Sequence, residues 1–170
     1  GGLGNDSIVG GVGDDTILGN AGLDTIFGGV GNDSIDGGTE ADSIDGGDGN
    51  DSILAGDGND TVFGGAGLDT IFGGIGADSI DSGSESDSID GGAGNDTIIF
   101  GTGDDTVFGG DGADFIDDAI GSILNGANSV FGGAGNDTIY TGDGADTVFG
   151  GADDDQIFGE GGADSLVGDD

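Results

Sequence analysis

Aspartate recurs at every ninth position of the chain, and this series carries the clearest potential for chemistry. Each carboxylate offers two oxygen atoms to a hard cation, and a regular spacing would gather many such ligands into rows. Only Asn128 stands where the series requires an aspartate. We take the members of the series as candidate metal ligands: Asp6, Asp15, Asp24, Asp33, Asp42, Asp51, Asp60, Asp69, Asp78, Asp87, Asp96, Asp105, Asp114, Asp137, Asp146, Asp155 and Asp164.

The charge of the chain indicates which partners it can take. The 170 residues include 36 Asp or Glu and no Lys, Arg or His, so acidic side chains have no basic side chain to pair with. The negative sign excludes nucleic acid and anionic membranes as partners. Membrane insertion is not expected either, because no stretch approaches the roughly 20 apolar residues that a span needs. Oxygen-only ligands favour calcium ions as the partner that neutralises the charge.

The same composition restricts catalysis. Without His, Cys or Lys, the common nucleophile–base pairs and soft-metal sites cannot be built. Paired carboxylates could still catalyse hydrolysis, but here the pairs recur at equal spacing and single out no active site. We therefore expect that the chain is not an enzyme.

The aspartate series belongs to a nonapeptide repeat, G-G-x-G-x-D-x-U-x, in which U is apolar. Eighteen units fill a single domain over residues 1–170, with an interruption at 118–131 where five residues, Asp118 to Ser122, are inserted. Seventeen of the eighteen U residues are Ile or Val, which favour strands. Each unit thus predicts a six-residue glycine-rich turn and a three-residue strand, and two units predict one coil of 18 residues. Stacked coils give an all-β parallel solenoid with two short parallel sheets.

Stacking makes the aspartates a problem that a cation would solve. Successive coils lie roughly 4.7–4.9 Å apart, so residues 18 apart, such as Asp6 and Asp24, would lie above one another. Two carboxylates at that distance repel by about 3 kcal/mol at an effective dielectric of about 20. One ion for each stacked pair of units would give up to about 16 Ca²⁺, and its binding energy would become folding energy. The sequence predicts an unfolded calcium-free chain and a folded calcium form.

The repeat resembles the repeats-in-toxin (RTX) family of hemolysin-type calcium-binding proteins over essentially the whole chain. The resemblance implies a right-handed parallel β-roll, calcium ions between adjacent turns, and export by a type I secretion system. We therefore expect a secreted, extracellular chain that is part of a larger protein, as a structural module of an adhesin, a surface layer or a fibre. The alternative is the C-terminal folding and secretion module of a type I-secreted protease or lipase whose catalytic domain lies outside this chain.

Several positions depart from the repeat. Glu40, Glu85 and Asp153 replace a turn glycine, where a side chain should either strain the turn or direct a carboxylate toward the ion. Asn128 keeps an oxygen but loses the charge, so the neighbouring sites should be weak or empty. For the inserted residues, a tolerated bulge and a functional loop are both open.

The outward strand positions are aromatic or acidic in most units, and residues 131–158 carry a run of aromatics. These rings either contact another domain or another copy of the chain, or form lateral ladders within each sheet. The remaining outward row is Ser or Thr. Its neighbouring column holds Phe, Asp or Leu rather than a second Thr, which disfavours an ice-binding face.

Overall fold

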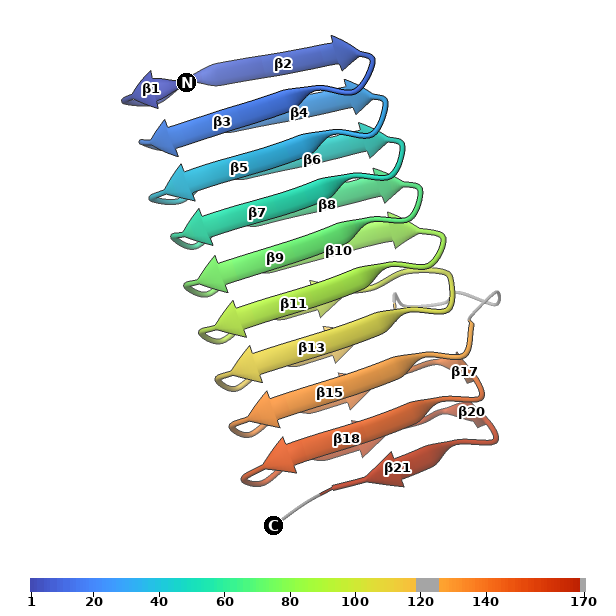
Figure 1. The fold of residues 1–170 in the computed structure, drawn as a ribbon. Helices are drawn as coiled ribbons and strands as arrows, with labels where there is room; N and C mark the ends of the chain where they lie inside the picture. Colours follow the sequence, from blue (N-terminus) through green and yellow to red (C-terminus); the bar gives the residue numbers. More distant parts are fainter. Residues whose placement is uncertain (119–125, 169–170) are drawn as a thin grey trace.

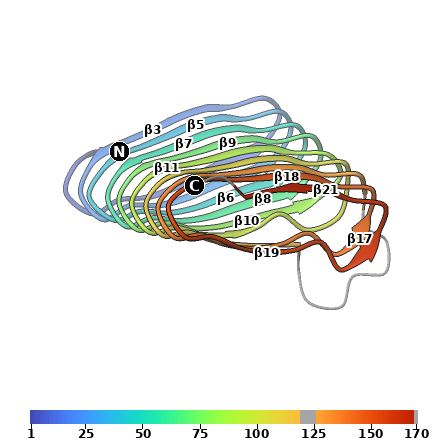
Figure 2. The same cartoon turned by 90° about the horizontal axis from the view of Figure 1, so that it is seen from below.

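The computed structural model, which describes residues 1–118 and 126–168, is a right-handed parallel β-solenoid of about nine coils (Figure 1). In Figure 1 the near strands run to the left and the far strands to the right while the coils descend from the N-terminal to the C-terminal end. Viewed along its axis, the roll is a flattened tube with turns at both edges (Figure 2). The predicted all-β parallel architecture is confirmed.

Two large sheets form the flat faces, and each contains every second strand in order. The ten-stranded sheet consists of β1 (Gly2–Leu3), β3 (Thr16–Ala21), β5 (Ser34–Thr39), β7 (Ser52–Asp57), β9 (Thr70–Ile75), β11 (Ser88–Ala93), β13 (Thr106–Asp111), β15 (Ser129–Ala134), β18 (Thr147–Ala152) and β21 (Ser165–Val167). The nine-stranded sheet consists of β2 (Ser7–Val12), β4 (Thr25–Val30), β6 (Ser43–Asp48), β8 (Thr61–Ala66), β10 (Ser79–Ser84), β12 (Thr97–Ile99), β14 (Phe115–Asp117), β16 (Thr138–Tyr140) and β19 (Gln156–Phe158). A small third sheet pairs β17 (Asp143–Gly144) with β20 (Gly161–Gly162).

The predicted coil length is confirmed by the register. Neighbouring strands pair residues 18 apart, for example Ile26 with Ile44. Across the interruption the spacing becomes 23, because Phe115 pairs with Thr138, which confirms five inserted residues. Of the predicted insertion, Asp118 is described and residues 119–122 lie outside the described residues.

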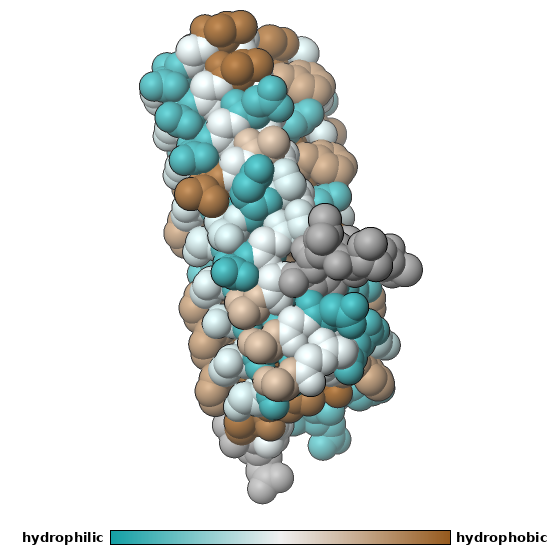
Figure 3. Space-filling view, turned by 90° about the vertical axis from the view of Figure 1, so that its right-hand side faces the viewer, coloured by the Kyte–Doolittle hydropathy of each residue, from teal (hydrophilic) through white to brown (hydrophobic). Residues whose placement is uncertain are grey.

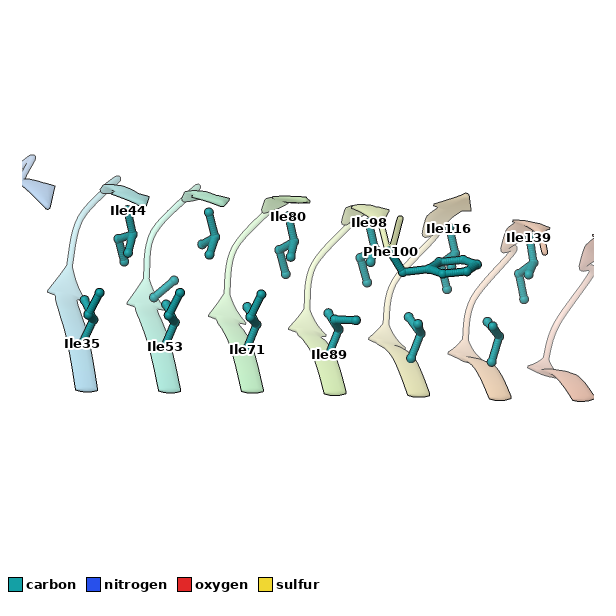
Figure 4. Close-up of a cluster of buried hydrophobic side chains, with 14 of the residues drawn as sticks. Ile35, Ile44, Ile53, Ile71, Ile80, Ile89, Ile98, Phe100, Ile116 and Ile139 are labelled. Atoms are coloured by element: carbon teal, nitrogen blue, oxygen red, sulfur yellow. The ribbon is translucent and has the colours of Figure 1, made fainter. Parts of the chain in front are cut away.

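The core is a double row of β-branched side chains between the two sheets. Ile35, Ile53, Ile71 and Ile89 face Ile44, Ile80, Ile98 and Ile116 across the interior, with exposures of 2% or less (Figure 4). The inward side chains of neighbouring strands lie one above the other, so each coil packs its apolar residues against those of the coils above and below. Burial fails at the last coil, where Leu166 is 46% exposed.

Most strands are longer than the sequence predicted. Thirteen strands, β2 to β11 among them, run for six residues and include both positions, mostly glycine, that the pattern assigned to the turn. The second of these glycines has φ between +100° and +118° from Gly29 to Gly151, a conformation that side chains rarely adopt. The turns are correspondingly short, and each presents its aspartate at the edge of the roll.

On the outward faces of the sheets, acidic residues do not lie next to one another. Among paired strand residues, every acid has a non-acidic neighbour on either side: Asp45 lies between Phe27 and Phe63, and Asp90 between Phe72 and Phe108. Hydrophilic and hydrophobic residues are also intermixed on the side of the roll that Figure 3 shows. Like charges directly opposite destabilise a sheet, and this alternation avoids them.

The outward aromatics form ladders toward the C-terminal end. Phe131 stacks between Phe108 and Phe149 at centroid distances of 4.9 and 5.3 Å, and Tyr140 stacks on Phe158 at 4.6 Å. The lateral ladders considered from the sequence are thus present. In the described part of the chain, no helix is long and apolar enough to cross a membrane.

Candidate metal centre

The aspartate series forms two columns, one along each edge of the roll. We define the first edge by Asp6, Asp24, Asp42, Asp60, Asp78, Asp96, Asp114, Asp137 and Asp155, and the second edge by Asp15, Asp33, Asp51, Asp69, Asp87, Asp105, Asn128, Asp146 and Asp164. Members that have a coil on both sides are buried, with exposures of 1–3% from Asp24 to Asp146. Asp6, Asp15, Asp155 and Asp164 in the end coils are half-buried. The structure therefore brings all of the predicted ligands into rows.

One oxygen of each carboxylate from Asp24 onward accepts a backbone hydrogen bond. The backbone N–H of Asp60 donates to Oδ1 of Asp78 at 2.8 Å, and the N–H of Asp78 donates to Oδ1 of Asp96 at 2.8 Å. The same bond links successive members along both columns. Asn128 keeps the ladder intact, because its Oδ1 accepts from the N–H of Asp105 at 3.0 Å. A carboxylate thus holds each turn onto its neighbour.

The other oxygen is buried without a hydrogen-bond donor. Oδ2 of fifteen aspartates in the series, from Asp15 to Asp155, has no partner among the described residues. A buried polar atom left unpaired destabilises a fold by about 1–3 kcal/mol, and more when it is charged. Repetition of this defect along both edges indicates that most of these oxygens have a partner outside the chain's own donors.

A glycine lies against most of these oxygens, and a side chain in its place would collide with them. A methyl group added at Gly28 would lie 2.5 Å from Asp33 Oδ2 and 2.5 Å from the carbonyl oxygen of Gly46. At Gly91 the same test finds Asp96 Oδ2 at 2.7 Å and the Gly109 carbonyl oxygen at 2.6 Å. We call this space, next to the glycine five residues before an aspartate and lined by Oδ2 and the carbonyl oxygen of the next coil, an oxygen cradle.

Burial raises the pKa of the column carboxylates, so they ionise less readily when no cation is bound. Desolvation raises the pKa of Asp87 to about 7, and it raises the pKa of six other members to about 6, while the N–H donor on Oδ1 lowers the pKa in each case. The six are Asp42, Asp69, Asp78, Asp105, Asp114 and Asp137. Stacked neighbours, such as Asp60 and Asp96 around Asp78, raise the pKa further. A divalent cation would reverse both effects.

A second ladder on the turns was not expected from the sequence. The side chain before the aspartate is often Asn, and Oδ1 of Asn50 accepts from the N–H of Leu68 in the next coil at 2.9 Å. Asn59 and Asn95 bind Ala77 and Ala113 in the same way. The recurrence of Asn directly before the aspartate could have predicted this ladder, because Asn side chains readily accept hydrogen bonds from backbone amides in turns.

The acidic turn residues are directed toward neighbouring amides. Glu40 and Glu85 adopt φ of 71° and 73°, and Oε2 of each accepts from the N–H of Gly22 and Gly67 respectively at 2.8 Å. Asp153 has φ of 86°. At both glutamates, the positive φ occurs together with a carboxylate that accepts a hydrogen bond from the neighbouring coil.

The arrangement suits a hard divalent cation that accepts main-chain oxygen. Among the described residues, no three acidic, His or Cys side chains converge on one point, so a bound ion would draw on carbonyl oxygen as well as carboxylate. Ca²⁺ accepts six to eight such oxygens in flexible geometry, whereas Mg²⁺ requires a strict octahedron. The orphaned Oδ2 and the cradle therefore fit Ca²⁺, held by the aspartates together with turn and strand carbonyls.

Comparison with known families agrees with this site. A family model described as the RTX calcium-binding nonapeptide repeat, in four copies, matches residues 1–35, 27–62, 36–71, 63–98, 72–107, 91–117, 124–157 and 140–170. Together these matches span nearly the whole chain and leave out only the centre of the interruption. No curated protein sequence matches the chain.

Proposed function

Because the chain belongs to the RTX calcium-binding nonapeptide repeat family, we propose that it is a structural module of a secreted adhesin, surface-layer or fibre protein that folds when calcium binds outside the cell. A calcium-binding β-roll of this family is typical of proteins exported by type I secretion. The proposal assigns the chain a mechanical rather than a catalytic role.

The observation that carries the proposal is the row of fifteen buried, unpaired carboxylate oxygens in a chain without a single basic side chain. The protein contains no cationic side chain that could neutralise them. Elsewhere in the strands, no acid pairs with another acid across the sheet, whereas the aspartate columns stack acid on acid along both edges. Selective stacking of charge at the edges is explained if cations lie there.

The calcium midpoint of folding tests the proposal. Extracellular calcium modules typically bind at roughly 10⁻⁴–10⁻³ M, well above cytosolic levels. We expect far-UV circular dichroism at neutral pH to show a cooperative gain of β signal with its midpoint in that range. Magnesium at equal concentration should produce no such gain. A chain that is already folded in excess chelator at pH 7.5 would contradict the proposal.

We further propose that the aromatic run at residues 131–158 contacts a second copy of the chain or a neighbouring domain. Phe149 and Phe158 are 37% and 42% exposed although their ring faces stack within the ladders. Calcium binding would lower the net charge of -36 that otherwise keeps copies apart.

Sedimentation velocity of the calcium form tests this contact. Association should increase with protein concentration and should weaken in Phe149→Ser. Phe27→Ser is the matched control, because Phe27 is 43% exposed and lies between Val9 and Asp45, outside any ladder. A calcium form that stays monomeric at the highest attainable concentration refutes the contact with a second copy.

A further inference from the structure

The two edges of the roll differ in the residue that lies five positions before each aspartate. On the first edge this residue is glycine in every coil except one, where it is Ala55. On the second edge glycine is present at positions 10, 28, 46, 64 and 159, and in the four units between 64 and 159 the sequence has Ser82, Phe100, Ile123 and Thr141 instead. The positions that lack glycine lie in successive coils around the interruption. The first edge therefore keeps glycine in all coils but one, while the second edge loses it in four successive units.

Protein groups occupy the cradles of the second edge in these coils. The hydroxyl of Ser82 donates to the carbonyl oxygen of Phe100 at 3.1 Å, and this is the carbonyl that would complete its own cradle. Phe100 is fully buried and lies beside Ile98 and Ile116 in the interior (Figure 4). A phenyl ring leaves no room for an ion at the place where most coils have the hydrogen of a glycine.

The next two coils show the same substitution of protein groups for an ion. The amide Nδ2 of Asn128 donates to the carbonyl oxygen of Thr141 at 3.5 Å. Asn128 is 3% exposed and uncharged, and it continues the ladder by accepting from Asp105 and by donating its own N–H to Asp146 Oδ1 at 2.8 Å. The buried side chain of Thr141 fills the cradle position in front of Asp146. Side-chain bulk thus fills the cradles of Asp105 and Asp146, and a hydroxyl or amide donor takes up the cradle carbonyl beside Asp87 and Asn128. No donor among the described residues reaches Oδ2 of Asp87, Asp105 or Asp146.

We infer that calcium lines the first edge along the whole roll but is absent from the second edge between Ser82 and Thr141. This inference rests on the proposed calcium function and refines it. The first edge offers eight cradles, counting the one at Ala55, and the second offers four, at Gly10, Gly28, Gly46 and Gly64. The chain then binds about twelve ions instead of the sixteen that uniform stacking predicts.

The number of bound ions is the first test. Equilibrium dialysis of the whole chain against saturating calcium, followed by elemental analysis, should give about twelve ions per chain. A count of sixteen overturns the inference while leaving the calcium function intact. A chain that binds no calcium at all refutes the proposed function itself, so the two failures are distinguishable.

A matched pair of variants locates the missing ions. Asp78 on the first edge and Asp105 on the second are both 2% exposed, and both take part in the backbone ladder. Asp78 has a glycine cradle at Gly73, whereas Asp105 has Phe100 in that place. We expect Asp78→Asn to lose at least one ion and to raise the calcium midpoint several-fold. Asp105→Asn should keep the wild-type ion count, because no ion lies beside Phe100.

Equal ion losses in the two variants overturn the inference. Asparagine keeps the Oδ1 acceptor in both variants, as Asn128 does in the native chain, so neither substitution should break the backbone ladder. Should Asp105→Asn fail to fold, the ion count of the unaltered chain still decides between twelve and sixteen.

Discussion

Acidification to pH 5 in the presence of chelator is expected to restore much of the roll that calcium removal abolishes at pH 8. The folded carboxyl groups of Asp87 and Asp78 have pKa values of about 7 and 6, against 3.8 for an ordinary aspartate. The folded chain therefore binds protons more tightly than the unfolded chain. This contribution to stability is complete below about pH 3.8 and is lost as the pH rises through 6 to 7.

The size of the effect follows from the number of groups. A shift of two pKa units corresponds to at most about 3 kcal/mol for one carboxyl group. Seven members of the columns have pKa values of about 6 or 7, and they act in the same direction. Protonation would remove the charge repulsion between stacked coils, as calcium does, without supplying a bridging ligand.

Far-UV circular dichroism and thermal melts between pH 8 and pH 5 measure this effect. The lower limit stays above the sequence pI of about 4.1, so the chain keeps enough charge to remain in solution. In calcium the same acidification should act in the opposite direction, raising the calcium midpoint because protons compete for the ligands. A β signal in chelator that is unchanged from pH 8 to pH 5 would show that the buried carboxyls do not limit folding.

Replacing the central glycine Gly74 by alanine is expected to lower the melting temperature of the calcium form by about 10 °C, from a loss of about 3 kcal/mol or more. Gly74 has φ of +111°, which excludes most side chains, and an added methyl group would collide with the backbone oxygen of Gly56 in the preceding coil. Backbone in a parallel sheet cannot move aside without breaking its ladder.

Two other substitutions control for loss of glycine as such. Gly2→Ala adds a methyl group where no atom lies within 4 Å, so it should leave melting unchanged. Asn20→Gly should stabilise the chain by about 1 kcal/mol, because Asn20 occupies the equivalent position with φ of 80°. Calcium-saturated melting curves of the three variants provide the comparison. Wild-type melting of Gly74→Ala would mean that the coils tolerate a side chain between them.

The aspartate spacing was enough to predict the coil length and both columns, because side chains 18 residues apart must stack in any solenoid with this period. The inward isoleucines followed from the same argument, and Ile26 and Ile44 are fully buried as expected. The strand length was not predictable from composition. Glycine is a poor strand former, yet Gly29 and Gly47 pair directly within a sheet because nothing larger fits between successive backbones.

The detailed state of the carboxylates also depended on the structure. From the sequence, Asp60 and Asp78 were expected to repel or to share an ion, whereas the fold gives Oδ1 of Asp78 a backbone donor and leaves Oδ2 for an ion. The exceptions at Ser82, Phe100 and Thr141 were visible in the sequence. Their effect on ion binding can be inferred only from the structure, which places the residue five positions before each aspartate beside Oδ2.

The five-residue insertion leaves the pairing on either side unchanged. Val107 still pairs with Val130 and Phe115 with Thr138, so the strands before and after the insertion keep the alignment of an uninterrupted array. The scaffold is thus periodic in space without being strictly periodic in sequence. The chain between β14 and β15 accommodates a change in length, because the pitch of the array is maintained by the strand pairing on either side.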